Sequence, residues 1–165
     1  MHRRSFKKNF IIMLSIANID VLNTLSVFKK YGVRVSFIVP TNTGLKKSIM
    51  DATEDIRLFL KDAGIHNYIN QSKGKENKII KECTLITGND SIETKVSLYR
   101  PETKDGDPRI WIYELKKYAV AGDLLALVTN KKKLLIVNCS NTEIKNHFDK
   151  KISDLFYAKN NKLSS

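Results

Sequence analysis

Basic and aromatic residues alternate through the segment 97–118, which reads SLYRPETKDGDPRIWIYELKKY. This segment holds the only tryptophan of the chain and two of its three prolines. Lysine and arginine bind phosphate, arginine also reads guanine through two hydrogen bonds, and aromatic rings stack on bases. The segment therefore has the residue types of a DNA-binding strand and loop.

The candidate DNA contacts come from this segment and from the polar loop that precedes it. The set is Lys73, Lys75, Lys78, Arg100, Lys104, Arg109, Lys116 and Lys117. Arg100 and Arg109 are the predicted base contacts, because a planar guanidinium matches the guanine edge. Tyr99, Trp111 and Tyr113 either stack on bases or belong to the core, since alternating strand aromatics fit both roles. The polar loop also has the composition of an ordinary solvated loop.

The same segment allows an alternative, a small nuclease that uses Mg²⁺. Asp107, Glu114 and Lys116 would be its catalytic residues, with the carboxylates on the metal and the lysine on the developing charge. A Glu-x-Lys triplet arises easily in a chain this rich in lysine, and an aspartate before Pro108 suits a turn. We therefore expect no catalytic residue, no metal and no cofactor, with Mg²⁺ only under the nuclease alternative.

The net charge of the chain is +12, from 29 Lys and Arg against 17 Asp and Glu. A surface this basic attracts polyanions by counterion release, so double-stranded DNA is the expected partner. The charge is dispersed, and its longest basic run is 131–133, which favours a folded basic face over a cationic tail. A generally lysine-rich proteome is the alternative explanation.

Two cysteines, Cys83 and Cys139, lie in apolar runs that resemble strands. Neither has a second cysteine or a histidine at metal spacing, so zinc is not expected. Buried free thiols in a reducing cytoplasm are the prediction.

Residues 1–17 form a basic lead-in followed by a short apolar run. This outline fits a weak secretory signal, and the run is far too short to span a bilayer. Met13 is an alternative natural start. We expect residues 1–17 to be an N-terminal extension. We expect the protein to be cytoplasmic and to have no membrane partner, and export is the less favoured alternative.

The first half of the chain predicts two helices and one strand. Apolar residues recur at helical spacing over 18–32, with Ile19, Leu22, Leu25 and Phe28 in one stripe. The segment 33–39 alternates as a strand does, and 41–44 is a predicted turn. A capping box from Asp51 to Glu54 opens a second helix that ends at Gly64.

The second half predicts strands joined by short turns. A hairpin pairs 78–87 with 92–99 around 88–90, and strands 109–113, 124–129 and 134–139 follow. The core candidates on the hairpin are Ile80, Leu85, Ile86, Val96 and Leu98. With no helical crossover between them, these strands favour antiparallel pairing.

A capping box from Ser140 to Glu143 opens one C-terminal helix that ends near Lys159. Its apolar stripe is Ile144, Phe148, Ile152, Leu155 and Phe156. We predict an α+β fold: a mainly antiparallel sheet or small pseudobarrel of about six strands, with two helices in the N-terminal half and one at the C-terminus. The organisation is an extension (1–17), a DNA-recognition-like domain (18–140) and a C-terminal helix with a frayed tail (141–165).

Three runs carry a family resemblance: Phe37-Ile-Val-Pro-Thr-x-Thr-Gly-Leu-x-Lys-Ser-Ile-Met-Asp-Ala52, Phe59-Leu-Lys-Asp-Ala-Gly-Ile-His66, and the segment 97–119 with its Gly106-Asp-Pro-Arg-Ile-Trp111. They resemble the N-terminal, non-catalytic region of MvaI/BcnI-type type II restriction endonucleases. In that family this region precedes a separate PD-(D/E)xK catalytic domain. Glu114 departs from the small residue that the family favours.

The resemblance implies a DNA-recognition module of a restriction-modification or defence system that lacks its own catalytic domain. A separate nuclease domain or subunit would be its partner. The small Mg²⁺-dependent nuclease is the first alternative. A protein-interaction partner in a restriction or defence system is the second.

Overall fold

The computed structural model describes residues 19–88, 90–131 and 133–158. The predicted extension at 1–17, with its choice of start, and the tail after residue 158 lie outside these ranges.

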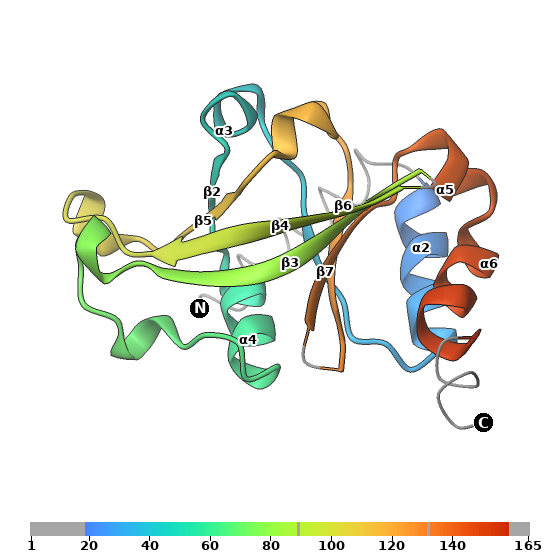
Figure 1. The fold of residues 1–165 in the computed structure, drawn as a ribbon, viewed down its shortest axis with the longest axis horizontal. Coiled ribbons are helices and arrows are strands. Elements are labelled where there is room, and N and C mark those ends of the chain that lie inside the picture. Colours follow the sequence, from blue (N-terminus) through green and yellow to red (C-terminus); the bar gives the residue numbers. More distant parts are fainter. Residues whose placement is uncertain (1–18, 89, 132, 159–165) are drawn as a thin grey trace.

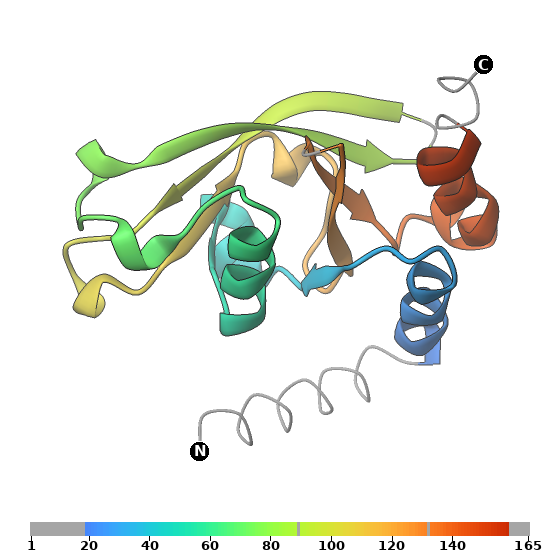
Figure 2. The same ribbon diagram turned by 90° about the horizontal axis from the view of Figure 1, so that it is seen from below.

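One curled sheet dominates the described residues, and it has seven strands in the order β1-β6-β7-β3-β4-β5-β2. Its strands are β1 (Ser36–Ile38), β2 (Ile49–Asp51), β3 (Ile79–Thr87), β4 (Asp90–Tyr99), β5 (Arg109–Ile112), β6 (Leu125–Asn130) and β7 (Lys133–Asn138). Neighbours pair antiparallel except β3 and β7, which are parallel. The sheet forms a half-barrel (Figures 1 and 2). The predicted α+β fold is confirmed, and β2 is the short strand that the sequence pattern missed.

Five α-helices accompany the sheet in the described residues. They are α2 (Ile19–Lys30), α3 (Asn42–Lys47), α4 (Glu54–Asp62), α5 (Thr142–Asn146) and α6 (Phe148–Ser153). Short 3₁₀ turns include η1 (Tyr68–Asn70), η2 (Lys75–Asn77), η3 (Lys104–Gly106) and η4 (Leu115–Lys117).

The concave inner face of the sheet packs against α4. Ile56, Phe59 and Leu60 of this helix are buried together with inward side chains such as Leu98 and Ile110. These inward residues occupy every second position of their strands, as the pleat requires. Figure 2 shows α4 beneath β3 and β4. The core of the half-barrel therefore lies between α4 and the strands.

The outer face carries a second core, under α2, α5 and α6. Phe28 and Phe148 meet there edge to face, with ring centroids 5.4 Å apart. The strand residues under these helices come from β1, β6 and β7, and β3 contributes Ile86 at its end. The helices therefore cover only one half of the outer face (Figure 1).

One position of the predicted helical stripe and one of the predicted hairpin core are exposed instead. Leu22 is 54% exposed, because α2 turns Val21, Thr24 and Phe28 toward the sheet instead. Ile80 is 48% exposed, because it lies on the outer face of β3 beyond the reach of the three helices. The rest of the hairpin core is buried as predicted.

The helix starts also differ from the predicted capping boxes. Thr53, not Asp51, caps α4 and accepts from the Ile56 amide at 3.4 Å. Asn141, not Ser140, caps α5, and its side-chain oxygen accepts from the backbone amides of Glu143 and Ile144. In both cases the cap is the residue with an extended backbone directly before the first helical turn. The predicted 41–44 turn is the start of α3.

The predicted C-terminal helix is broken in two at His147, whose backbone leaves helical geometry (φ −130°, ψ 35°). Its apolar stripe still faces the sheet, with Ile144, Ile152 and Phe156 buried and Phe148 packed beside them.

Both cysteines are free and buried, as predicted. Burial raises the pKa of the Cys83 thiol to about 12 and also raises that of Cys139. Thiols held protonated in this way are packing groups rather than nucleophiles.

Candidate nucleic-acid interface

The uncovered half of the outer face carries a row of side chains that crosses four strands. Ile80 lies opposite Ser97, Ser97 opposite Trp111, and Trp111 opposite Ile49. Tyr113 stands two residues beyond Trp111, and the two ring centroids are 5.6 Å apart with a tilt of 42°. Trp111 is 38% exposed. We call Ile49, Ile80, Trp111 and Tyr113 the Trp111 patch.

Ser97 lies within this patch yet is only 1% exposed. Its hydroxyl has no hydrogen-bond partner. Because the described helices do not cover this part of the sheet, neighbouring side chains of the same face shield it. The patch therefore groups apolar side chains on one face of the strands.

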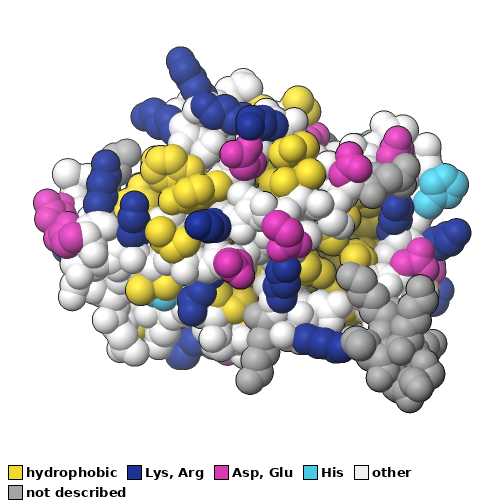
Figure 3. Space-filling view, in the orientation of Figure 1, with side chains coloured by type: hydrophobic (Ala, Val, Ile, Leu, Met, Phe, Trp, Pro, Cys, Tyr) yellow, Lys and Arg dark blue, Asp and Glu magenta, His cyan; other side chains and the backbone are white. Residues whose placement is uncertain are grey.

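A cluster of lysines stands at one border of the patch. Lys46 and Lys47 end α3, and Lys116 and Lys117 lie in η4, which contacts α3. All four are exposed. Figure 3 shows Lys and Arg side chains gathered over α3, next to the hydrophobic surface. We call these four residues the α3–η4 cluster.

Local packing fixes the position of α3. The Thr41 hydroxyl caps the helix and accepts from the Gly44 amide at 3.0 Å. A Cβ on Gly44 would stand 3.2 Å from the Ile49 carbonyl and 3.3 Å from the Met50 side chain. Glycine therefore allows α3 to lie directly on β2, which brings its lysines to the edge of the patch.

The loops at 71–78 and 100–108 meet at the end of β4, although they are distant in sequence. The Gly74 amide donates to the Arg100 carbonyl at 2.7 Å. The Arg100 guanidinium donates to the carbonyls of Gly106 at 3.0 Å and Gln71 at 3.1 Å. The Lys73 side chain packs over Gly106, whose left-handed backbone (φ 72°) favours glycine. The structure thus brings Lys73, Lys75 and Lys78 next to the loop that contains Lys104.

Arg100 is the residue that joins these two loops, so we expect Arg100→Met to loosen them. Its two hydrogen bonds come from a charged donor, and each such bond contributes about 1.5–3 kcal/mol. Because Arg100 is only half-buried, we expect a loss of roughly 1–3 kcal/mol in the free energy of unfolding, measured by urea denaturation. The matched control is Lys95→Met on the exposed part of β4, which should change stability by less than about 0.5 kcal/mol. Equal stability of wild type and Arg100→Met would contradict this role.

Arg109 and Tyr99 are less accessible than the sequence suggested. Arg109 forms an ion pair with Asp51 across β5 and β2, and its side chain is 15% exposed. Tyr99 is 8% exposed. Both line a pocket of about 550 Å³ whose rim includes Thr41 and Lys47. The base contacts predicted for Arg100 and Arg109 stay predictions.

The residues of the nuclease alternative are separated by β5. Asp107 precedes this strand and Glu114 follows it. Glu114 has a left-handed backbone (φ 70°) and pairs with Lys117 at 2.6 Å, while Lys116 is exposed. Within the ranges that the structure describes, no group of three or more His, Cys, Asp or Glu side chains could hold a metal ion.

His66 forms a hydrogen bond with Gln71, the first residue of the loop at 71–78. Its Nε2 lies 3.0 Å from Gln71 Oε1, and Gln71 in turn donates to the carbonyls of Leu98 at 2.8 Å and Asn77 at 3.0 Å. Burial lowers the pKa of His66, with a further lowering by the charge of Lys81. The folded protein therefore binds a proton at His66 less readily than the unfolded chain does.

This pKa shift predicts a pH dependence of stability. The contribution of His66 is complete above about pH 6.5, its ordinary pKa, and is lost as the pH falls through the lower folded pKa. Urea unfolding at about pH 7.5 and 5.5 should show a larger loss for wild type than for His66→Gln. His147→Gln, at an exposed histidine, is the control and should behave as wild type. Parallel losses in wild type and His66→Gln would refute the prediction.

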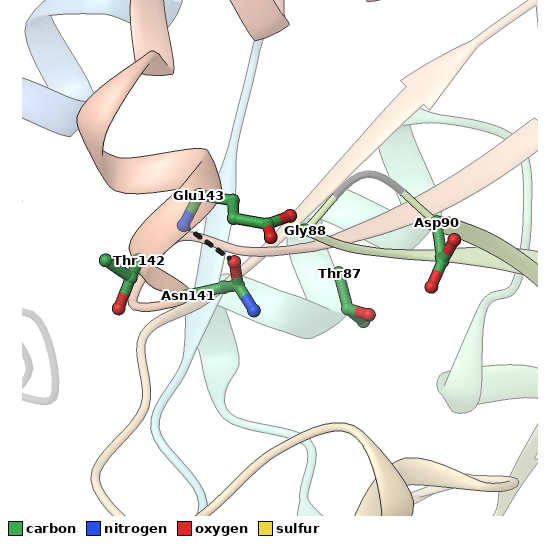
Figure 4. A pocket seen from close by; sticks show the side chains of 6 residues that line it. All are labelled: Thr87, Gly88, Asp90, Asn141, Thr142 and Glu143. Carbon is green, nitrogen blue, oxygen red and sulfur yellow. Dashed lines mark hydrogen bonds between the residues drawn. The ribbon is translucent and has the colours of Figure 1, made fainter.

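Acidic groups collect at the opposite end of β3 and β4. Figure 4 shows a pocket there, lined by Thr87, Gly88, Asp90, Asn141, Thr142 and Glu143. The Asn141 side chain is occupied in accepting from the Glu143 amide at 3.0 Å. The carboxylates of Asp90 and Glu143 would repel phosphate, so this end is unsuited to a nucleic-acid backbone.

No family model, curated protein or solved structure matches this chain. Among the described residues, no helix has the length and apolar character needed to cross a membrane.

Four contributors to this surface were missed from the sequence: Lys46, Lys47, Ile49 and Ile80. The Lys46-Lys47 pair after the Thr41–Gly44 turn was the available signal for the first two. Ile49 and Ile80 gave none, because an apolar residue in a strand is assigned to the core unless its face is known.

Proposed function

We propose that this protein is a DNA-binding module without catalytic activity of its own, which binds double-stranded DNA on the uncovered half of its outer face. In this proposal it is a cytoplasmic protein related to the recognition region of MvaI/BcnI-type restriction endonucleases. A separate nuclease domain or subunit would supply cleavage.

The observation that carries the proposal is the distribution of charge around the Trp111 patch. The α3–η4 cluster stands at one border, and Lys73, Lys75 and Lys78 belong to the loops at the end of β4. Lys95 is exposed on the patch's own face of β4. The acidic pocket lies at the other end of the sheet. Lysines spread over one face can contact successive phosphates, although exposed Glu82 lies opposite Lys95 and Glu114 pairs with Lys117 on this face.

The test is a salt series with a fluorescently labelled duplex, followed by anisotropy. If about six lysines contact phosphates, the affinity should fall roughly 10³-fold between about 50 and 200 mM salt. Absence of duplex binding at low salt, or binding that does not respond to salt, would contradict the proposal and favour a protein partner.

A further inference from the structure

The Trp111 patch is an apolar surface that none of the described helices covers. Trp111 is 38% exposed and Ile80 is 48% exposed, on neighbouring parts of the same face. Other exposed apolar residues of the described chain, such as Leu58 on α4 and Ile69 in η1, belong to different elements. Grouped apolar exposure around a tryptophan is typical of a binding surface.

The charge around the patch selects the kind of occupant. Exposed lysines border it and outnumber the neighbouring carboxylates: the α3–η4 cluster lies beside Ile49, with Lys117 paired to Glu114, and Lys95 on the same strand face lies opposite Glu82. A ligand for this surface must combine a flat apolar group with negative charge a short distance away. A nucleotide strand has both, because each base is joined to a phosphate.

The position of the rings determines which nucleic acid fits. Trp111 stands on β5 within the sheet, with its side chain on the outer face beside Tyr113, rather than on a projecting loop or helix. Bases inside a duplex are stacked on one another and offer only their edges. Unpaired bases expose their ring faces, and aromatic side chains on a sheet surface stack on them.

We infer that the Trp111 patch binds an unpaired nucleobase by stacking on Trp111 while the bordering lysines hold the adjoining phosphates. This inference rests on the proposed function and extends it. The protein would bind single-stranded or locally unpaired nucleic acid more tightly than a perfect duplex.

The chain has a single tryptophan, so tryptophan fluorescence reports on Trp111 alone. Quenching of this fluorescence by a bound nucleic acid therefore tests the inference directly. The probes are a thymidine oligonucleotide, a uridine oligonucleotide of the same length, and a perfect duplex. The single strands should quench the fluorescence to saturation, and the duplex should quench it much less. The thymidine strand is DNA and the uridine strand is RNA, and they differ in the sugar and in the methyl group of the base. Comparing their affinities shows whether the protein prefers single-stranded DNA or RNA.

Variants separate stacking from charge. Trp111→Leu should weaken single-strand binding about tenfold, measured by anisotropy, and change duplex binding less than about twofold. Trp111→Phe keeps an aromatic face and should retain most of the affinity. Leu58→Ala, an exposed apolar residue on α4, is the control and should bind as wild type. Circular dichroism confirms that each variant is folded.

The outcomes distinguish this inference from the proposed function. Salt-dependent binding of duplex without quenching by single strands would overturn the inference and leave the proposed function standing. Equal weakening of single-strand and duplex binding by Trp111→Leu would also overturn it. If no probe binds at low salt, both fail. A dimer that Trp111→Leu converts to monomer would assign the patch to self-association instead.

Discussion

Replacing all four lysines of the α3–η4 cluster with glutamine should weaken duplex binding by roughly two to three orders of magnitude at about 0.1 M salt. Each lysine that contacts a phosphate releases a condensed counterion, so the loss grows with every contact removed. The slope of log affinity against log salt should become shallower by about 3 to 4. Anisotropy titrations of wild type and the fourfold variant at several salt concentrations measure both quantities.

The matched control also removes four positive charges, but from the helices that cover the outer core. It replaces Lys29, Lys30, Lys145 and Lys150, all exposed on α2, α5 and α6, with glutamine. The ion pair of Lys30 with Asp149 is exposed and contributes little to stability. Similar losses of binding in the two fourfold variants would show that only net charge matters, and would remove the α3–η4 cluster from the interface.

Leu98→Ala should destabilise the protein by about 2–5 kcal/mol. Leu98 is fully buried in the inner core, and truncation leaves a cavity that the strands cannot close. The free energy of unfolding, measured by urea denaturation, should fall by this amount with the m-value unchanged.

Ile80→Ala on the adjacent strand provides the comparison. Ile80 is an aliphatic residue of the same size in the same hairpin, but it points to the uncovered outer face. Its truncation should cost no more than about 0.5–1 kcal/mol. A large loss for Ile80→Ala together with a small one for Leu98→Ala would mean that the two faces of the sheet are assigned the wrong way round.

The local pattern of the sequence predicted most of the strands and the fold class. Alternation along β3 and β4 identified Leu85, Val96 and Leu98 as core, and all three are buried. It could not place Ile80, because alternation gives the face of a side chain but not whether a helix covers that face. The three residues of β2 were too few to show any period.

The candidate interface depended even more on long-range packing. The sequence identified Trp111 and several of the surrounding lysines. It could not show that α3 lies on β2, which adds Lys46 and Lys47 to Lys116 and Lys117. The sequence also could not show that the Arg100 guanidinium donates its hydrogen bonds to backbone carbonyls of two loops, at Gly106 and Gln71. These facts follow from contacts between residues that are distant in the chain.

The direct test of nucleic-acid binding on the outer face is a map of backbone amide chemical shifts as duplex DNA is added to isotope-labelled protein. We expect the largest changes in α3, in η4 and in the loop at 71–78, where the exposed lysines lie. Amides of α5 and α6 and those beside the acidic pocket should shift little. Changes confined to α2, α5 and α6, or no changes at low salt, would contradict the central claim.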